Sequence, residues 1–510
     1  MKIKEESDTA VINIALDTIR NGKQALIFVN TKRSAEKTAE EISKKLKTTE
    51  NDLANNVLKA LSRPTVQCRR LANCVEKGIA FHHAGLVQKQ RELIEDNFRE
   101  GKIKMIVATP TLSMGVDIPA FRSIIRDLKR YSHRGLEYIP VLEYHQMAGR
   151  AGRPKYDKYG EAICIATTEA NKEEIVEKFI NGKPEEIYSK LAVEPVLRTY
   201  LLSLIAANFV RNKKQIIDFF SKTFWAYQFK DMERLEEIID KMLDLLEEWE
   251  FIQRKEEGFT SAGEIGSGVI QATILGKRVA ELYIDPLTAY YLIECSRRAT
   301  NKELNAFSFL QAISNTLEMR PLLRVKNKEY QMIEEALVKY SGNLLEEEPS
   351  MYDLGYKDFI NSIKTALFME DWINEKSEEE LLEKYDIRPG EIRVKLDNGD
   401  WLLYSMHELC RILKFQILLK EVMKARLRLK NGVKEELLGL LRLKNIGRVR
   451  ARRLFNNKIK TIEDVKKADL GKIKAILGEK VALDIKEQVG EKIVVVKENK
   501  RKGQISLSDY

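Results

Sequence analysis

The chain has 510 residues, of which 44% are hydrophobic and 32% are charged, and its net charge is +10. At about 150 residues per domain, this length predicts three or four domains, each long enough to bury a core. The composition is that of a globular protein, and the positive charge favours a polyanionic partner, nucleic acid rather than a membrane surface.

Several classes of protein are excluded by short patterns. The five cysteines show no C-x-x-C spacing, which is typical of free thiols in a reducing compartment. No Cys/His set has metal-ligand spacing, so we expect no bound metal. There is no run of 18 apolar residues, and the charged segment Met1–Ser7 lacks the apolar stretch of a signal peptide. We therefore predict a cytoplasmic protein without a membrane span.

Apolar runs at residues 25–29, 79–86 and 105–108 are typical of buried strands, and Gln88–Arg99 has the periodicity of an amphipathic helix. Polar residues follow each strand. Asn30 and Thr31 follow the first, His83 lies where the second runs into a loop, and a Thr/Pro/Ser/Gly loop ending at Asp117 follows the third. Ligands of an open α/β sheet bind at the carboxyl ends of its strands, so these residues are candidate ligand contacts.

The segment Gln146–Pro154 reads Q-x-x-G-R-A-G-R-P. The spacing of Arg150 and Arg153 predicts both guanidinium groups on one side of a helical turn. The glycine before each arginine would let a phosphate approach the backbone closely. Arginine recognises phosphate oxygens with a fork of donors, so we interpret the segment as an arginine finger. The alternative is a basic surface turn.

In this order, the segments resemble the second RecA-like lobe of a superfamily 2 helicase. Asn30-Thr31 is similar to motif IV, residues 109–117 to motif V, and residues 146–154 to motif VI. The amino-acid sequences of motifs V and VI are similar to those of the branch that contains exosome-type RNA helicases and archaeal Hjm repair helicases. The match covers roughly residues 10–190.

The resemblance implies ATP and Mg²⁺ as cofactors of the full-length enzyme, with Arg150 and Arg153 at the γ-phosphate. It also implies that Asp117 and Gln146 respond to the nucleotide, that Gly115 lies beside it, and that a set of polar residues holds the DNA strand. These strand contacts are Asn30, Thr31, His83, Thr109 and Thr111.

The sequence contains no G-x-x-x-x-G-K-[ST] phosphate loop and no D-E-x-H box. In the family these belong to a first RecA-like lobe, which the resemblance places before the segments found here. We therefore expect that this chain alone binds no nucleotide strongly and has negligible ATPase activity.

Residues 122–144 predict a strand, a glycine-containing turn and a second strand. Related DNA helicases carry a strand-separating hairpin at this place, so Tyr131, His133 and Arg134 are candidate DNA contacts. The alternative is an ordinary hairpin of the lobe.

Three predicted helices, beginning at Pro195, covering Lys213–Phe229 and covering Met232–Trp249, are followed by a short hairpin near residue 251. This pattern predicts a winged helix. Its third helix is acidic, which opposes binding in a DNA groove and favours a scaffold.

Arg388-Pro389-Gly390-Glu391 predicts a helix start, with proline and an acid in the first turn. By the resemblance, this helix lies beneath the single strand and acts as a ratchet, with Arg393 and Trp401 against the bases. The arginine match is imperfect in register, and a core tryptophan is the alternative for Trp401.

A helix–hairpin–helix is predicted around Asn445-Ile446-Gly447, where asparagine tolerates a left-handed backbone. The free N–H groups that follow can hold a phosphate, and the basic side chains favour sequence-independent contacts. The candidates are Gly447, Arg448, Arg450, Arg452 and Arg453. A solvated basic face is the alternative, and a weaker second copy is predicted over residues 470–489.

The last residues place Gln504, Leu507 and Tyr510 in the spacing of a sliding-clamp-binding peptide. This pattern lacks the usual second aromatic residue, so a disordered basic tail is the alternative.

The predicted fold class is multidomain α/β plus α. A RecA-like parallel-sheet lobe covers residues 1–190, a winged helix 191–282, a helical ratchet domain 283–430, and a helix–hairpin–helix domain with a basic tail 431–510. We expect the monomeric C-terminal part of an ATP-dependent 3′–5′ DNA helicase that unwinds branched DNA and stalled forks. The alternatives are an exosome-type RNA helicase and a non-catalytic nucleic-acid-binding fragment.

Overall fold

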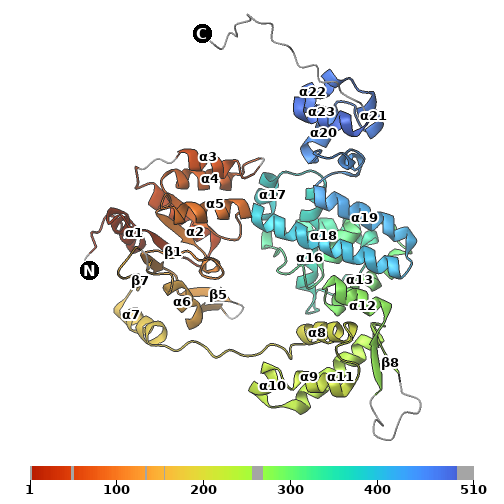
Figure 1. Ribbon diagram of the computed structural model, residues 1–510, viewed down its shortest axis with the longest axis horizontal. Helices are drawn as coiled ribbons and strands as arrows, with labels where there is room; N and C mark the ends of the chain where they lie inside the picture. The colour runs from red at the N-terminus through yellow and green to blue at the C-terminus, as the bar shows by residue number, and fades with distance from the viewer. Residues whose placement is uncertain are drawn as a thin grey trace, which may run out of the picture. The chain divides into compact units, whose positions relative to one another are not determined.

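The computed structural model describes residues 3–47, 51–61, 63–132, 135–153, 156–255 and 268–490. The chain divides into two compact units. The first comprises residues 1–280 and 377–395, and the second comprises residues 281–376 and 396–510. Figure 1 shows the elements of both units along the chain.

A five-stranded, all-parallel sheet forms the core of the first unit, with the strand order β2-β3-β1-β4-β7. The strands are β1 (Ala25–Phe28), β2 (Ile79–His82), β3 (Met105–Ala108), β4 (Arg122–Ile125) and β7 (Glu161–Cys164). Every residue of β1, β2 and β3 is buried, which explains their almost unbroken apolar sequence. This sheet confirms the prediction of a mixed α/β fold.

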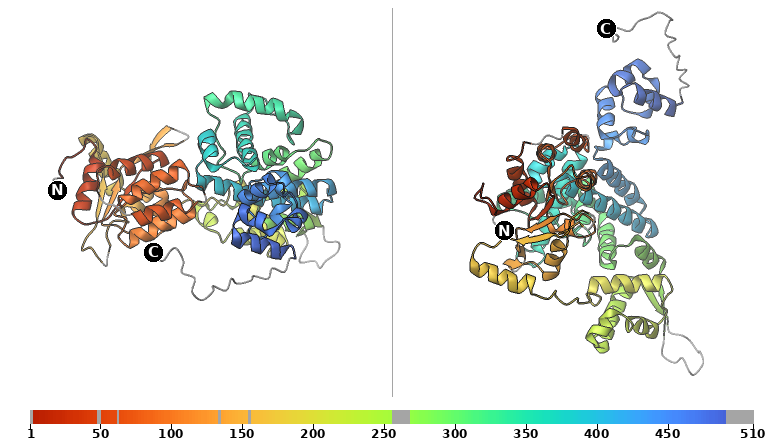
Figure 2. Two further views of the ribbon diagram at one scale, coloured as in Figure 1. Left: turned by 90° about the horizontal axis from the view of Figure 1, so that it is seen from above. Right: turned by 60° about the vertical axis from the view of Figure 1, so that its left-hand side comes forward.

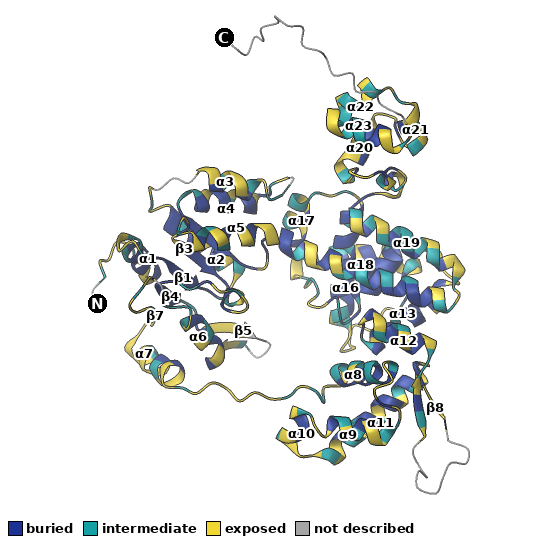
Figure 3. Cartoon of the chain, in the orientation of Figure 1, coloured by how far each residue is buried: buried dark blue, intermediate teal, exposed yellow. Residues whose placement is uncertain are grey.

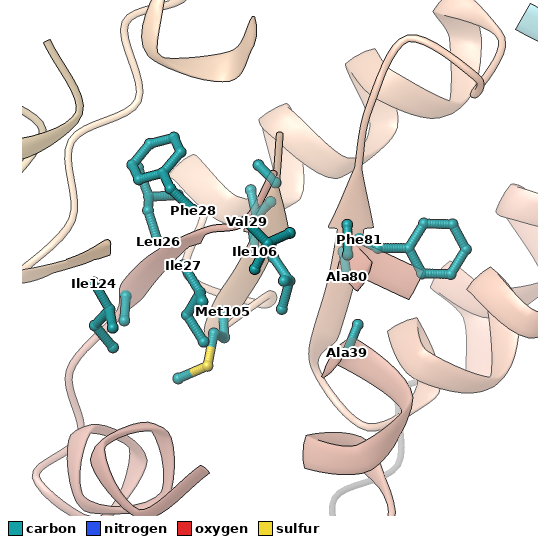
Figure 4. Close-up of a cluster of buried hydrophobic side chains, with 14 of the residues drawn as sticks. Leu26, Ile27, Phe28, Val29, Ala39, Ala80, Phe81, Met105, Ile106 and Ile124 are labelled. Carbon is teal, nitrogen blue, oxygen red and sulfur yellow. The ribbon is translucent and has the colours of Figure 1, made fainter. Parts of the chain in front are cut away.

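Short helices surround this sheet and bury its apolar side chains (Figure 1). They are α1 (Ala10–Arg20), α2 (Lys32–Ser43), α3 (Asn51–Leu58), α4 (Val66–Glu76), α5 (Gln88–Arg99), α6 (Val141–Ala148) and α7 (Glu169–Ile175), with a 3-10 turn η1 (Pro110–Ser113) and a π-helical turn η2 (Val176–Ile180). Leu26, Phe81 and Ile106 belong to the cluster of side chains that fills this core (Figure 4). The predicted helix Gln88–Arg99 is confirmed by α5.

A two-stranded hairpin, β5 (Lys129–Ser132) and β6 (Gly135–Tyr138), stands between β4 and α6 in the sequence. The hairpin confirms the predicted strand-turn-strand. In contrast to the sheet, it carries exposed side chains (Figure 3), and Tyr131 is 85% exposed.

The region after the lobe contains α8 (Glu194–Ala206), α9 (Lys213–Phe220), α10 (Phe224–Phe229), α11 (Met232–Glu248), and the antiparallel pair β8 (Ile252–Lys255) and β9 (Val269–Ala272). The prediction of one helix over Lys213–Phe229 is wrong. The chain turns after Phe220, and the Thr223 side chain accepts a hydrogen bond from Ala226 N, which starts a new helix.

The second unit is helical. Its regular elements, with α12 at the boundary, are α12 (Ile274–Leu282), α13 (Pro286–Ala299), α14 (Ala306–Ser314), η3 (Asn327–Glu329), α15 (Tyr330–Tyr340), η4 (Ser341–Asn343), α16 (Tyr356–Ile373) and α19 (Gln416–Asn431). Helices α14, α16 and α19 pack against one another (Figure 2). Two further helices, α17 (Glu378–Tyr385) and α18 (Pro389–Ile412), begin in residues assigned to the first unit. No described helix is long and apolar enough to cross a membrane.

The C-terminal described segment has a small core of its own, formed by residues such as Leu440, Leu454 and Ile485. Its elements are η5 (Glu435–Leu437), η6 (Leu440–Arg442), α20 (Arg448–Asn456), α21 (Ile462–Lys467), α22 (Leu470–Leu477) and α23 (Glu479–Gln488). The predicted left-handed residue is confirmed, because Asn445 has a φ of 64°. The helix predicted before this turn is wrong, since two short 3-10 turns stand there.

Candidate nucleic-acid interface

The carboxyl edge of the parallel sheet gathers the polar residues that the sequence singled out. Asn30 and Thr31 follow β1, His83 follows β2, and Thr109 follows β3. These three strands are neighbours in register, so their ends meet at one edge. This edge is the place where an open α/β sheet binds its ligands.

Asn30 and Thr31 are each hydrogen-bonded within the lobe, and each keeps further polar atoms that could bind a ligand. The Asn30 N–H donates to Asp127 Oδ2 (3.0 Å), and the Thr31 hydroxyl caps α2 by accepting from Ser34 N (3.0 Å). The side chain of Thr31 is exposed, and the O–H of a hydroxyl that accepts a hydrogen bond can still donate to a phosphate.

The loop after β3 is open to solvent at its far end. Thr109 is buried and its hydroxyl lies 2.9 Å from that of Thr111, which is exposed. Gly115 has a φ of 77° with open space around it, and the Asp117 side chain is 99% exposed. The loop therefore exposes three kinds of group to solvent: the hydroxyl of Thr111, the backbone at Gly115 and the carboxylate of Asp117.

His83 is fully buried, whereas the predicted strand contacts Thr31 and Thr111 are exposed. Its Nδ1 accepts from Gly85 N (3.1 Å), and its Nε2 lies 3.2 Å from Glu36 Oε1. Burial lowers the pKa of His83, although Glu36 opposes this shift. In this arrangement His83 contacts protein groups, and its contact with a DNA strand stays a prediction.

Arg150 reaches back to the loop after β3. Its Nε donates to Ser113 O (3.2 Å), and its Nη1 lies 3.9 Å from Asp117 Oδ1. The guanidinium is thus held beside the exposed Asp117 and remains 20% exposed itself.

Arg153 points to a different set of groups. Its Nε donates to Asp157 Oδ2 (2.7 Å), its Nη1 donates to Gln24 Oε1 (2.5 Å), and the Asp157 side chain is only 1% exposed. The Arg153 hydrogen bonds hold the pKa of Asp157 below its usual range, although burial opposes them. Arg153 is therefore fixed by a buried carboxylate.

The prediction of one shared helical turn is wrong, because α6 ends at Ala148, before both arginines. Backbone packing also explains the second glycine of the motif. Gly152 has a φ of 96°, and a Cβ on the facing Gly160 would lie 2.2 Å from Gly152 N.

The hairpin is braced against α6. Arg130 Nη1 donates to both carboxylate oxygens of Glu143 (2.9 and 3.0 Å), and the Glu143 side chain is 9% exposed. On the other strand, Tyr138 packs edge-on against Phe179 (5.6 Å between ring centroids). The candidates His133 and Arg134 lie outside the described residues.

Helix α18 presents its two candidates differently. Arg393 is exposed, whereas Trp401 is half-buried and its Nε1 donates to Leu282 O (2.9 Å). The indole is thus fixed at its polar edge.

The arginines of α20 form two groups. Arg452 donates to Glu375 Oε2 (2.8 Å), and the Arg448 guanidinium lies 4.8 Å from the centre of a Trp372 ring. The others are exposed: Arg453, and Arg450, whose Nη1 donates to Asn445 O (2.7 Å). Gly447, which precedes the helix, is also exposed. The clamp-peptide candidates Gln504, Leu507 and Tyr510 lie outside the described residues.

Three family models match successive parts of the chain. A helicase conserved C-terminal domain matches residues 7–155, a helix-turn-helix domain matches residues 160–253, and domain 4 of an archaeal helicase matches residues 307–432. Together they support a DNA-binding, archaeal superfamily 2 helicase.

Curated relatives match almost the whole chain. The ATP-dependent DNA helicase Hel308 of Pyrococcus horikoshii is 39% identical over 98% of this chain and 69% of its own length. The chain belongs to the Hel308 family of ATP-dependent DNA helicases. The Hel308 proteins of Pyrococcus abyssi and Methanococcus vannielii are 39% and 37% identical, each over 96% of this chain and over 67% and 69% of their own lengths.

For a Hel308-family chain, the residues present fit a nucleotide phosphate at the motif V and VI loops. Gly115 has open space around it, and the partly exposed guanidinium of Arg150 on the adjoining loop can donate to phosphate oxygens. The Gln146 Oε1 is buried with no hydrogen-bond partner within the described part of the chain, and as an acceptor it would take a donor such as a water or a ribose hydroxyl. Arg150 is better suited than Arg153 to reach a ligand, because a backbone carbonyl and an exposed Asp117 release it more easily than a buried carboxylate. In the described ranges, no group of three or more His, Cys, Asp or Glu side chains is arranged to hold a metal ion.

Sequence reasoning missed Glu143 and Glu36. Both are acids on short helices, Glu143 in the first turn of α6 and Glu36 in α2, and each is buried against an arginine from another element. A buried carboxylate has no local sequence signal, because its partner is set by the tertiary fold.

Proposed function

We propose that this chain is the strand-tracking part of a 3′–5′ DNA helicase that unwinds branched DNA and stalled forks. The observation that carries the proposal is the carboxyl edge of the sheet, where Thr31, Thr111 and the loop that ends at Asp117 lie together in a Hel308-family chain. Membership of a DNA helicase family favours DNA over RNA as the strand.

In this proposal, ATP hydrolysis supplies the free energy for movement. Arg150 and Arg153 bind the nucleotide phosphates beside Gly115, and Asp117 and Gln146 report the nucleotide to the strand-binding edge. Asn30, Thr31, Thr109 and Thr111 donate hydrogen bonds to the strand backbone, with His83 behind them. Such contacts hold any sequence.

Other elements supply DNA contacts on either side of the carboxyl edge of the sheet. The β5–β6 hairpin, with Tyr131, His133 and Arg134, separates the duplex. Arg393 and Trp401 contact the single strand from α18, and the exposed arginines around Gly447 hold the backbone after it. We propose four domains with boundaries at residues 190, 282 and 430, and a sliding clamp as a partner of the C-terminal Gln504–Tyr510.

The first experiment measures DNA binding and ATP turnover by this chain alone. We expect the chain to bind a single-stranded oligothymidylate, with an affinity that falls steeply with salt because phosphate contacts release counterions. We expect no DNA-stimulated ATP turnover, because the sequence lacks a phosphate loop.

Competition with an RNA strand of matching sequence serves as the control. Equal competition by RNA would contradict the choice of DNA, and robust ATP turnover would contradict the assignment of the nucleotide contacts. An enzyme with both lobes, tested on forks with single strands of either polarity, would decide the direction of movement.

A further inference from the structure

The first turn of α18 is attached to the lobe by buried polar contacts that the helicase motifs do not explain. Gly390 N donates to Gly85 O (3.0 Å), and Arg388 Nε donates to Glu36 Oε1 (3.0 Å). All four residues belong to the first unit. The side chains of Glu36 and Arg388 are only 4% and 11% exposed.

Glu36 lies at the centre of these contacts. Besides Arg388, it accepts from Arg70 Nη1 (2.7 Å) and Gln67 Nε2 (3.0 Å), and it lies 3.2 Å from His83 Nε2. Burial alone would raise the pKa of Glu36, but His83, Arg388 and Gln67 together hold it well below its usual range. One ionised carboxylate therefore joins α2, α4, the loop after β2 and the start of α18.

The backbones approach so closely at Gly390 that this position must be glycine, whereas a side chain at Gly85 would collide with the side chain of Arg388. A Cβ on Gly85 would lie 2.4 Å from Arg388 Cδ, and a Cβ on Gly390 would lie 2.4 Å from the carbonyl oxygens of Ala84 and Leu86. We name the set Glu36, His83, Gly85, Arg388 and Gly390 the α18 clamp.

An ion pair and a backbone hydrogen bond lie beside the α18 clamp. Lys32 pairs with Glu391, and Glu379 accepts from Val66 N (2.9 Å) at the start of α4. The ion pair is informative, because Lys32 follows Thr31 directly and Glu391 stands two residues before Arg393. Two candidate strand contacts from distant parts of the chain are thus tied together.

We propose that Glu36 is a positioning residue: through the α18 clamp, it holds Thr31 and Arg393 as one surface that contacts a single DNA strand. The proposal rests on the proposed function, which makes both residues strand contacts. A paired, hydrogen-bonded charge suits this role, because it fixes one register where an apolar contact would allow sliding.

The first half of the test follows hydrogen exchange of residues 377–395 in this chain. Gly85→Ala should push Arg388 away by contact, and Glu36→Gln should remove the charge while keeping the size. We expect the Gly390 amide to exchange roughly tenfold faster in either variant. Gly342→Ala is the matched control, because a Cβ there meets open space.

The second half measures binding of a single-stranded oligothymidylate in a mutant cycle. Arg393→Ala should weaken binding roughly fivefold in the unsubstituted chain. In the Glu36→Gln background the same substitution should have almost no effect, because Arg393 is no longer held beside Thr31.

Faster exchange together with loss of the Arg393→Ala effect supports the proposal. Unchanged exchange in both variants would overturn it, and so would an Arg393→Ala effect of equal size in both backgrounds; in either case the proposed function would stand. Failure of the unsubstituted chain to bind the strand would instead overturn the proposed function and, with it, this surface.

Discussion

Lys395 is a buried cation on α18, with 7% of its surface exposed. Burial lowers its pKa from 10.5 to about 8, and the nearby Glu391 only partly offsets this effect. Between pH 8 and 10.5 the unfolded chain holds a proton on this lysine that the folded chain has lost. The contribution of Lys395 to stability therefore rises with pH across this window.

We predict that Lys395→Met stabilises the protein at pH 7 by on the order of 3 kcal/mol, because the folded state no longer buries a charge. The gain should disappear above about pH 10.5. Urea unfolding of the unsubstituted protein and of the Lys395→Met variant, at pH 7 and at high pH, would measure this difference in the free energy of unfolding. An equal effect at both pH values would show that packing, rather than charge burial, determines the change.

At the scale of single residues, the partners of the predicted site residues could not be deduced from the sequence. Arg150 and Arg153 were expected to act alike, yet one contacts a backbone carbonyl and the other a buried carboxylate. Asp157, which makes this difference, is four residues beyond Arg153 and carries no motif. Spacing along the chain could not show which arginine the fold would pair with a buried carboxylate.

The hairpin is the element whose attachment suggests the clearest test. Arg130 joins it to Glu143, three residues before Gln146 on α6, so the hairpin is fixed to the helix of motif VI. The pair is fixed on the side of the buried Glu143, whereas Arg130 is 48% exposed and makes both hydrogen bonds through its Nη1.

We predict that Glu143→Gln, in an enzyme with both lobes, lowers the rate of duplex unwinding roughly tenfold while DNA-stimulated ATP hydrolysis changes less than twofold. The physical reason is that the hairpin loses its orientation while the nucleotide contacts remain. Glu137→Gln, on an exposed position of β6, is the control. A parallel loss of both activities would contradict a specific role for the brace.

At the scale of elements, strands with an apolar sequence could be predicted, whereas a strand that begins with a charged residue could not. The strands β1, β2 and β3 follow from their buried sequences, whereas β4 opens with Arg122 and its place in the sheet was not predicted. Arg122 is fully buried because Asp17 and Glu161 pair with it at 2.6 Å each. A charged residue at a strand start therefore conceals the strand until its partners are known.

At the scale of the whole molecule, the family matches run from a helicase C-terminal domain through a helix-turn-helix domain to domain 4 of an archaeal helicase, and the predicted domain boundaries stay a prediction. The division into compact units could not be predicted, because residues 377–395 belong with the lobe despite their distance in sequence. Such a return of the chain depends on close backbone contacts, such as that of Gly390 with Gly85, which have no local pattern.

The arginines of α20 fall into an exposed group and a group that contacts the protein. Arg450 and Arg453 are exposed, whereas Arg452 pairs with Glu375, whose side chain is 15% exposed, and with Glu436. Glu375 follows α16, so Arg452 holds the C-terminal segment to the helical region within the second unit.

We predict that replacing Arg450 and Arg453 by alanine lowers the slope of log affinity for single-stranded DNA against log salt by about 1.4, because two phosphate contacts are lost. Proteolytic sensitivity between residues 431 and 447 should not change. Arg452→Ala should do the opposite: it should raise that sensitivity severalfold by removing the ion-pair partner of the half-buried Glu375, with the salt slope nearly unchanged. If Arg452→Ala lowered the slope as much as the double substitution, Arg452 would be a DNA contact, and the pairing with Glu375 would have to open when DNA binds.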